Sequence, residues 1–396
     1  MTYLTMRKAF HMPDVDHNQL YQQRFSSEHT FLVGINVAGM PAFLHMAPEL
    51  YEQLLSIATL DKRIHNLRLA LPAEAVEDYL DSLLIDEIVI TNNIEGIGST
   101  RREVGDTLEL LARKDKRGRF AGIVKAYRTL SSGTDTPLST CADIRAAYDA
   151  IVLDEVLSGN PHNAPDGVLF REGPVQVIDG SGRTIHSGLT PETAITAALE
   201  AGLAFLQSEA IPLLARIAVF HFLFGYVHPF YDGNGRISRF ISSSYLAREY
   251  EPMAALTLSR AVERNIDSYY GAFRQCEHEL NRGDLTLFAL SFCAIVKQGM
   301  EEQIEQLTER KHLYERCLHQ LELCIDGKAA EVARQVLIDT LFSFNGSDAL
   351  ALAQKLGLSR QTVYKRLDSL RQADLLTTER IGHKTCHKLR TDLLLG

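Results

Sequence analysis

The chain has 396 residues, of which 45% are hydrophobic and 23% are charged, and this composition indicates two or three globular domains rather than a disordered chain. The net charge of −9 with neutral histidines excludes a protein that binds polyanions over its whole surface, so any contact with nucleic acid must be local. The sequence shows neither a secretory signal nor an apolar run of membrane-spanning length. Its six cysteines are scattered and lack the spacing of a zinc or redox site. We therefore expect a cytoplasmic protein with reduced thiols and no membrane contact.

The N-terminal part is predicted to be mostly helical. Residues up to about Phe43 show no clear period, so we expect an irregular lead-in there. Helical patterns follow over Ala47–Leu71 and Ala73–Ile90. A capping-box pattern, Thr100-Arg101-Arg102-Glu103, predicts the start of the next helix.

One acid stands out in the segment Thr91-Asn92-Asn93-Ile94-Glu95-Gly96. Glu95 follows the C-terminal end of a predicted helix, where a negative charge is unfavourable unless a cation meets it. Thr91 lies four residues earlier and shares the same helical face. We therefore expect Glu95 to contact an arginine; the alternative is an ordinary solvated acid.

The pattern changes from helical to strand-like after residue 169. Val175–Ile178 and Arg183–His186 are short β-type runs, separated by the turn residues Asp179-Gly180-Ser181-Gly182, and together they predict a hairpin. Because a two-stranded ribbon alone is marginal in water, it must pack on helices or bind an extended partner by strand addition.

The most informative stretch is His228-Pro229-Phe230-Tyr231-Asp232-Gly233-Asn234-Gly235-Arg236-Ile237-Ser238-Arg239. It follows Ile211–Tyr226, a run so apolar that it predicts a buried helix, in which His221 is expected to be a core residue. Pro229 should end that helix near Val227, and a second helix is expected from Arg236 to about Glu249.

The residue types in this stretch suit phosphate chemistry. A glycine-rich turn that opens a helix presents bare N–H groups and a favourable dipole to an anion, and Asn234 could add a side-chain donor. Asp232 is a hard oxygen ligand of the kind that Mg²⁺ prefers, and Arg236 and Arg239 could contact phosphates. His228 could accept a proton from a hydroxyl near neutral pH. These groups together predict transfer of a phosphate-containing group from a nucleotide to a hydroxyl.

The residues 329–390 form a separate predicted module. Helical patterns over Asp348–Leu356 and Arg360–Leu370 are joined at Gly357, with Ser359 as N-cap, which is typical of a helix-turn-helix. Two strand-like runs after residue 375 could form a wing. Residues 355–390 hold nine Lys or Arg against three acids, a net charge of +6, so the other residues carry −15. We expect DNA contact through Arg360, Gln361, Thr362 and Lys365; the alternative is a module for dimerisation or protein contact.

The stretch from His228 to Arg239 resembles the Fic motif, HxFx[DE]GNGRxxR, at every defined position. The Fic-like region covers about residues 126–296, and the upstream hairpin with Val175, Val177 and Ile185 is similar to the flap that aligns a target segment in this family. The segment from Thr91 to Gly96 resembles the family's inhibitory motif, [ST]xxxE[GN]. The resemblance implies a mainly α fold, a Fic-like helical bundle with a small β-hairpin flap, followed by a C-terminal winged helix-turn-helix, which also occurs in some members.

The resemblance also implies roles for single residues. His228 would be the general base and Asp232 the Mg²⁺ ligand, whereas Arg239 would bind the terminal phosphate of ATP or pair with Glu95 when inhibited. Further nucleotide contacts are expected from Gly233, Asn234, Gly235 and Arg236, and from Tyr269 and Tyr270, for which core packing is the alternative. The implied reaction is AMP transfer from ATP to a Ser, Thr or Tyr hydroxyl of a target protein, including the chain itself. Phosphate-transferring relatives of the Doc type carry lysine in place of the second glycine, so Gly235 favours AMP transfer.

Other interpretations remain open. Within the enzyme class, Glu95 could orient a water for removal of AMP. In another class, the chain could be a DNA-binding transcriptional regulator whose Fic core is a sensor. A homodimer is implied by resemblance only. The expected division is a helical region with the inhibitory motif (1–125), a catalytic core (126–297), a connector helix (298–327) and a winged helix-turn-helix (328–396).

Overall fold

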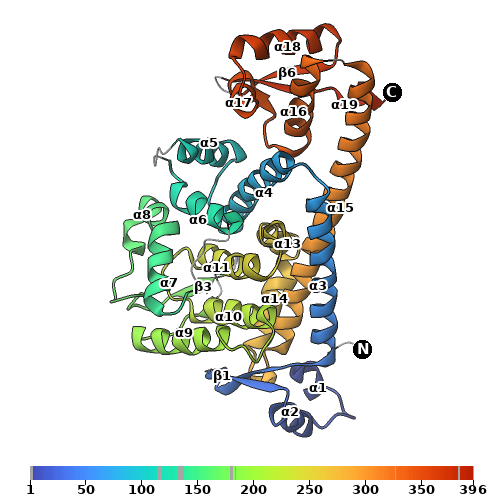
Figure 1. The fold of residues 1–396 in the computed structure, drawn as a ribbon. Coiled ribbons are helices and arrows are strands. Elements are labelled where there is room, and N and C mark those ends of the chain that lie inside the picture. Colours follow the sequence, from blue (N-terminus) through green and yellow to red (C-terminus); the bar gives the residue numbers. More distant parts are fainter. Residues whose placement is uncertain are drawn as a thin grey trace. The chain divides into compact units, whose positions relative to one another are not determined.

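The computed structural model describes residues 3–113, 118–132, 138–178, 182, 184–325, 327–381 and 384–395. It is mainly helical, and the strands that it describes form small antiparallel sheets (Figure 1), in agreement with the predicted fold class. In this described part, no helix is both long and apolar enough to cross a membrane. The chain divides into two compact units, Met1–Lys62 with Ile85–Glu301 and Arg63–Leu84 with Glu302–Gly396, and each is described by itself.

The elements follow one another along the chain with short connections. Those up to residue 163 are α1 (Met6–Phe10), α2 (His17–Phe25), β1 (Thr30–Val37), β2 (Met40–His45), α3 (Pro48–Leu69), α4 (Ala73–Ile94), α5 (Arg101–Ala112), α6 (Ala121–Ser132), α7 (Cys141–Tyr148), the π-helical segment η1 (Asp149–Leu153), α8 (Asp154–Gly159) and η2 (Pro161–Asn163). Those up to residue 324 are β3 (Gln176–Ile178), β4 (Thr184–Ser187), α9 (Glu192–Leu206), α10 (Leu213–Val227), α11 (Asn234–Glu249), α12 (Pro252–Ala255), α13 (Leu258–Arg264), α14 (Ile266–Cys276), η3 (Glu279–Asn281) and α15 (Thr286–Cys324).

The N-terminal lead-in is ordered, so the expectation of an irregular segment is wrong. Strands β1 and β2 pair antiparallel, and Phe43 lies in a buried cluster with Met6 and Tyr21. The backbone of Phe43 also accepts a hydrogen bond from the N–H of Leu285 at 2.9 Å. This contact joins residues far apart in sequence, which a local period cannot reveal.

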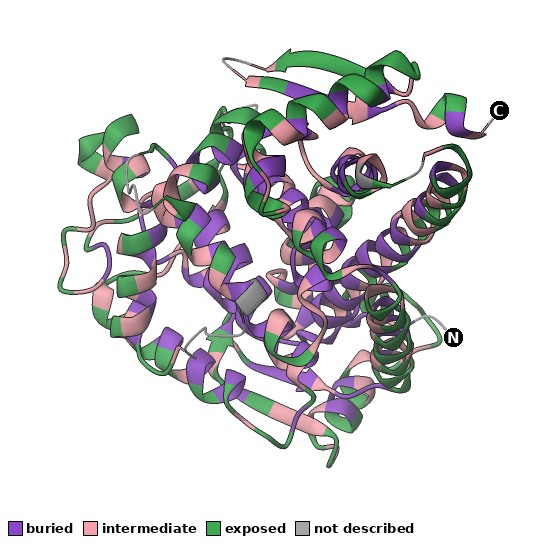
Figure 2. Cartoon of the chain, turned by 45° about the horizontal axis from the view of Figure 1, so that its top comes forward, coloured by how far each residue is buried: buried purple, intermediate pink, exposed green. Residues whose placement is uncertain are grey.

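The core of the first unit is built around α10. This helix contacts α9 and α11 (Figure 1), and its residues are buried on nearly all sides, as the apolar run predicted. Figure 2 shows many helices with buried residues, in purple, on one side and exposed residues, in green, on the other. Helix α10 ends at Val227, where His228 adopts a left-handed backbone, so α10 delivers His228 to the end of a rigid element.

Three local predictions can be compared with the structure. Thr100 and Glu103 form the expected capping box at the start of α5. The expected connector helix (298–327) is instead the C-terminal part of one longer helix, α15, of 39 residues. The predicted strands are present as β3 and β4, with Val177 opposite His186, whereas most of the predicted turn at 179–182 lies outside the described residues.

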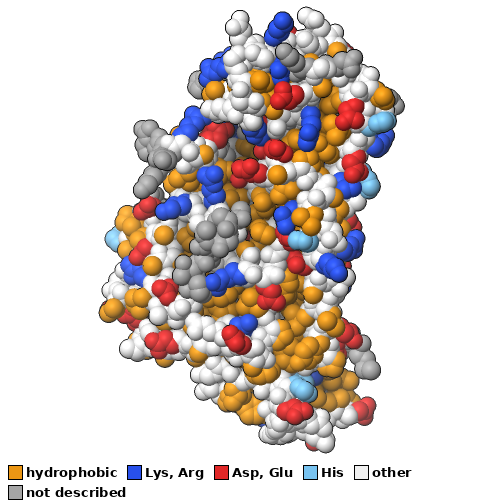
Figure 3. Space-filling view, in the orientation of Figure 1, with side chains coloured by type: hydrophobic (Ala, Val, Ile, Leu, Met, Phe, Trp, Pro, Cys, Tyr) orange, Lys and Arg blue, Asp and Glu red, His pale blue; other side chains and the backbone are white. Residues whose placement is uncertain are grey.

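The second unit contains the C-terminal residues and the first half of α4. Its elements are α16 (Lys328–Phe342), β5 (Ser347–Asp348), α17 (Ala349–Lys355), α18 (Arg360–Gln372), β6 (Leu376–Ile381), β7 (Lys384–Leu389) and α19 (Thr391–Leu395), with strand order β5-β7-β6. Lys355 contacts both Asp78 and Asp339, at 2.8 and 2.9 Å. On the face shown in Figure 3, acidic and basic side chains are interspersed.

Candidate active site

The loop after α10 is held by its own backbone and one amide side chain. The Asn234 amide accepts from the Phe230 N–H at 3.0 Å and donates to the Phe230 carbonyl at 2.8 Å. Gly233 has a φ of +80°, and a Cβ there would lie 3.1 Å from Val152. The side chain of Asn234 therefore fixes the turn, and this use occupies one of its two amide N–H donors.

The side chain of Arg171 fixes the position of the His228 backbone. Its guanidinium is fully buried and donates to the carbonyls of His228 at 2.8 Å, Gly173 at 2.5 Å and Leu189 at 2.8 Å. Gly173 and Leu189 are the two ends of the hairpin segment. One cation thus ties the hairpin and the His228 backbone together.

Burial controls the charge of His228. Desolvation, helped by the nearby positive charge of His186, lowers the pKa of His228 from 6.5 to about 4. The imidazole is therefore neutral at physiological pH, which is the form that can accept a proton.

Arg236 lies close to two acids, Glu155 and Asp232, beside the glycine turn. The Arg236 guanidinium is buried, and its Nη1 donates to Glu155 Oε2 at 2.5 Å. The Nε and Nη2 of Arg236 are buried without a hydrogen-bond partner in the described residues, although Nη2 lies 3.9 Å from Asp232 Oδ1. Asp232 is partly open to solvent, with 39% of its side chain exposed.

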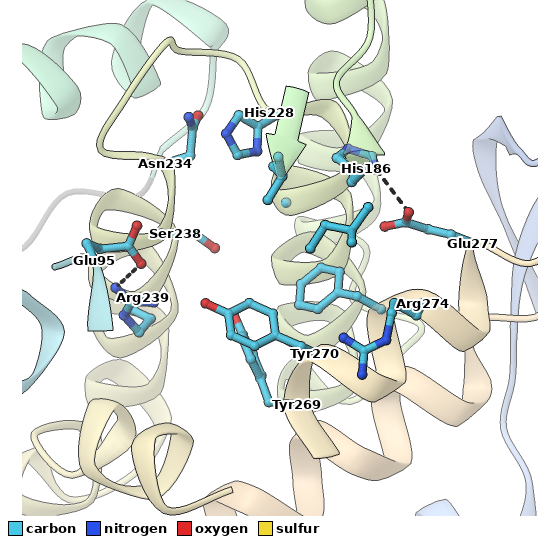
Figure 4. A pocket seen from close by; sticks show the side chains of 15 residues that line it. Glu95, His186, His228, Asn234, Ser238, Arg239, Tyr269, Tyr270, Arg274 and Glu277 are labelled. Carbon is cyan, nitrogen blue, oxygen red and sulfur yellow. Dashed lines mark hydrogen bonds and ion pairs between the residues drawn. The ribbon is translucent and has the colours of Figure 1, made fainter. Parts of the chain in front are cut away.

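The structure places Glu95 and Arg239 in contact (Figure 4). Arg239 Nη2 donates to Glu95 Oε1 at 2.7 Å, and Nε donates to the Thr91 hydroxyl at 2.8 Å. Arg239 is buried, whereas 22% of the Glu95 side chain is exposed. Glu95 also occupies space beside the turn, since a Cβ on Gly235 would lie 2.1 Å from Glu95 Oε1.

A second acid, Glu87, anchors helix α4 one turn before Thr91. Glu87 is fully buried and accepts from the N–H and hydroxyl of Ser259, at 2.9 and 2.6 Å. Desolvation raises the pKa of Glu87 to about 7, although the bonds from Ser259 oppose this shift. These contacts fasten the C-terminal half of α4 to the start of α13.

A cavity of about 180 Å³ opens between these groups, lined by His228, Gly235, Arg239, Tyr269 and Tyr270 among others. The Tyr269 hydroxyl lies 2.7 Å from His221 Nε2, and His221 Nδ1 lies 2.8 Å from Ser242. His221 is thus a satisfied core residue, as expected, and it braces Tyr269 at the wall. Tyr270 is 40% exposed.

Residues 139–246 match the model of the Fic/DOC family. The chain contains a Fic domain. The comparison with curated proteins returned no match. Members of this family are generally transferases and commonly transfer AMP onto proteins.

Solved structures of Fic proteins are similar to this chain at low identity. A Fic family protein from Desulfovibrio desulfuricans G20 is 19% identical with a TM-score of 0.51, over 87% of this chain and 96% of that chain. A Fic domain containing signaling protein from Bacteroides thetaiotaomicron is 18% identical with a TM-score of 0.46, over 64% and 95%. Fic-1 from C. elegans is 19% identical with a TM-score of 0.41, over 64% and 73%. At these identities the comparisons support a shared fold and nothing more. That conclusion rests on the Desulfovibrio desulfuricans structure.

The Fic domain offers groups that fit a nucleotide and a metal ion. The two donors of Arg236 that lack a hydrogen-bond partner suit phosphate oxygens, whereas the approach to Gly235 is occupied by the Glu95 carboxylate. The described residues contain no group of three or more His, Cys, Asp or Glu that could hold a metal ion. Asp232, partly open to solvent, would hold Mg²⁺, which usually takes one or two carboxylates together with substrate phosphates.

Two of the three residues predicted to form a flap, Val177 and Ile185, lie beside this cavity. Val177 and Ile185 line the cavity, and the Val175 carbonyl accepts from the Gly188 N–H at 3.1 Å, which extends the ladder. Ile178 and Ile185 expose 62% and 39% of their surface, so the hairpin presents apolar side chains to solvent.

Sequence reasoning missed several residues that shape the Fic site. Arg171 and Glu155 lie outside the motif, and an isolated charged residue is usually solvated. His186 was recognised only as a strand end, and nothing in the sequence links it to Glu277. Side chains alternate between the two faces of a strand, and in β4 this places His186 opposite Val177. This alternation was the one feature of the sequence that could have indicated an inward-facing His186.

Proposed function

We propose that the chain is an autoinhibited protein adenylyltransferase that transfers AMP from ATP to a Ser, Thr or Tyr hydroxyl of a target protein. His228 takes the proton of the target hydroxyl, and the hydroxyl oxygen forms a bond to the α-phosphorus of ATP. The bond between the α-phosphorus and the oxygen that bridges to the β-phosphate breaks, and pyrophosphate leaves. Arg236 and the turn at Gly233–Gly235 bind phosphate oxygens. Mg²⁺, held by Asp232, would neutralise charge on the phosphates.

The observation that carries this proposal is the ion pair between Glu95 and Arg239. A phosphate-binding arginine that is buried and already bound to a carboxylate at 2.7 Å cannot also meet the terminal phosphate. Thr91 takes another donor of the same guanidinium. The resting enzyme therefore binds ATP in an unproductive pose, or not at all.

The proposal is tested by a substitution that releases Arg239 from its ion pair with Glu95. In the Glu95→Gly variant, self-modification with ATP labelled on the α-phosphate is expected to rise roughly tenfold or more, because the lost charge-assisted bond is worth about 1.5–3 kcal/mol. Glu28→Gly is a matched control, since Glu28 also lies in a turn and its side chain is 88% exposed.

Two outcomes would contradict the proposal. Absence of label transfer in the Glu95→Gly variant, with and without a cell lysate, would argue against an adenylyltransferase. Release of AMP from a modified target by the unaltered protein, abolished in Glu95→Gly, would instead favour the hydrolase in which Glu95 orients a water.

We propose DNA binding as a second function of the C-terminal module. Arg360, Gln361 and Lys365 are exposed on α18, and Tyr364 beside them is 56% exposed. Several other basic residues of the module contact acids within it: Lys355, Arg366, Arg371, Lys384, Lys388 and Arg390. The exposed face of α18 is thus the part suited to phosphates and base edges.

A salt-dependent gel shift with double-stranded DNA tests this function. Arg360→Ala should weaken binding about tenfold, because a base or phosphate contact contributes on the order of 1–3 kcal/mol. Arg371→Ala, whose side chain pairs with Asp368, should leave binding nearly unchanged. Equal effects of the two substitutions would argue against α18 as the recognition helix.

A further inference from the structure

His186 connects the hairpin to the helical core through both of its ring nitrogens. It lies on β4, where its Nδ1 is 2.9 Å from Glu277 Oε2 and its Nε2 is 2.8 Å from the Tyr226 carbonyl. Glu277 caps the end of α14, and Tyr226 lies in the last turn of α10. Figure 4 shows His186 beside His228, with the dashed contact to Glu277.

The two partners decide the charge of this ring. A backbone carbonyl can only accept a hydrogen bond, and so can an ionised carboxylate. Both ring nitrogens must then donate, which requires the imidazolium form. Only 12% of the His186 side chain and 18% of the Glu277 side chain are exposed, so this ion pair is largely shielded from water.

The surroundings of His186 include further charged groups, and their net effect favours the cation. Burial lowers the pKa of His186, and Arg171 lowers it further, but the hydrogen bond and negative charge of Glu277 and the Tyr226 carbonyl raise it above its usual value. His228 also faces the ring, with centroids 6.3 Å apart, and Arg274 of α14 lines the same cavity.

We infer that His186 and Glu277 form a protonation-dependent latch that holds β4 against the core and so positions the target segment beside His228. The inference deepens the proposed function and rests on it for the role of the hairpin. His186 is directly opposite Val177 in the β ladder, and Val177 and Ile185 line the cavity. The latch therefore fixes the part of the hairpin that faces an incoming hydroxyl.

The pH dependence of the latch has a definite sign. A histidine whose pKa is raised by a contact stabilises that contact fully below its unperturbed pKa of about 6.5. The stabilisation is lost as the pH rises through the raised pKa. The hairpin should therefore be held more firmly at pH 6 than at pH 9, whereas loss of protons from ordinary carboxylates would act at far lower pH.

Hydrogen–deuterium exchange of the full chain tests the latch without any assay of transfer. Peptides covering residues 176–178 and 184–187 are followed at pH 6 and pH 9, with correction for intrinsic exchange. Protection in the unaltered protein should fall as the pH rises, by roughly tenfold for each unit by which the contact raises the pKa. His186→Gln should exchange faster at pH 6 and should lose this pH dependence. Glu277→Gln, which keeps an oxygen acceptor but removes the charge, should move the change in protection to lower pH.

Matched controls separate the latch from general instability. Glu279→Gln and His162→Gln change exposed side chains of the same types and should leave the hairpin unaltered, and exchange in α10 should stay the same in every variant. Equal hairpin protection at both pH values, or no effect of His186→Gln, would overturn the latch. If exchange behaves as expected but no AMP is transferred, the proposed function fails and the latch stands.

The readout for positioning uses the same variants in the Glu95→Gly background. The latch predicts that the rate of self-modification falls at alkaline pH, where His186 loses its proton. His186→Gln should lower the rate at pH 6–7 while the KM for ATP stays the same, and it should remove this alkaline fall. An unchanged alkaline fall would show that His186 does not position the modified segment.

Discussion

Alanine in place of His228, in the Glu95→Gly background, is expected to lower the rate of AMP transfer by about 10²- to 10⁴-fold, the usual contribution of a positioned general base. His228 is neutral at physiological pH, because burial and the charge of His186 depress its pKa to about 4. Its left-handed backbone, φ 52° and ψ 64°, turns the ring into the cavity at the end of α10. The loss should appear in single-turnover transfer of labelled AMP.

His162→Ala is the control for this substitution, because His162 is an exposed histidine on η2. Binding of a fluorescent ATP analogue should be retained in His228→Ala, since the phosphates are assigned to other residues. The acid limb of the pH profile should lie near pH 4 rather than near 6.5, because His228 must lose its proton to act. A His228→Ala variant with more than a tenth of the activity would contradict the role of general base.

Substitution of Arg171 by methionine is expected to lower the free energy of unfolding by about 3–5 kcal/mol, since buried carbonyls that lose their donors cost about 1–3 kcal/mol each. The carbonyls of His228, Gly173 and Leu189 would lose the guanidinium. The Val227 carbonyl would keep a donor, because the Leu189 N–H bonds to it at 3.1 Å. Urea unfolding followed by circular dichroism measures the change.

Arg113→Met is the matched control, because 65% of the Arg113 side chain is exposed and its pair with Glu109 spans 3.8 Å. Such a surface pair contributes at most about 0.5 kcal/mol. Arg171→Lys should recover only part of the loss, since one ammonium cannot reproduce the planar fork that meets three carbonyls. A change below about 1 kcal/mol in Arg171→Met would show that water replaces the guanidinium.

The features that could be predicted from the sequence have local signals. The long apolar run at 211–226 predicts the buried helix α10, and the pattern of Thr100 and Glu103 predicts the capped start of α5. Turn residues between two β-type runs predict the hairpin of β3 and β4. The contact between Glu95 and Arg239 was also predictable, because an acid at a helix C-terminus needs a cation, and the motif supplied a candidate.

The features that could not be predicted depend on contacts between distant segments. Strand β2 is held in part by residues 283–285, and His186 meets Glu277 across 91 positions. Arg171 lies in a segment with no period, and its burial follows from three carbonyls that the tertiary fold brings together. In each case the local sequence is compatible with a solvated side chain, and only the fold removes the water.

Glu95 and Gly235 share one volume, since a Cβ at position 235 would overlap the Glu95 carboxylate. A side chain at position 235 is therefore compatible with this fold only if the Glu95 carboxylate is removed or displaced. The ion pair between Glu95 and Arg239 thus depends on the absence of a side chain at position 235.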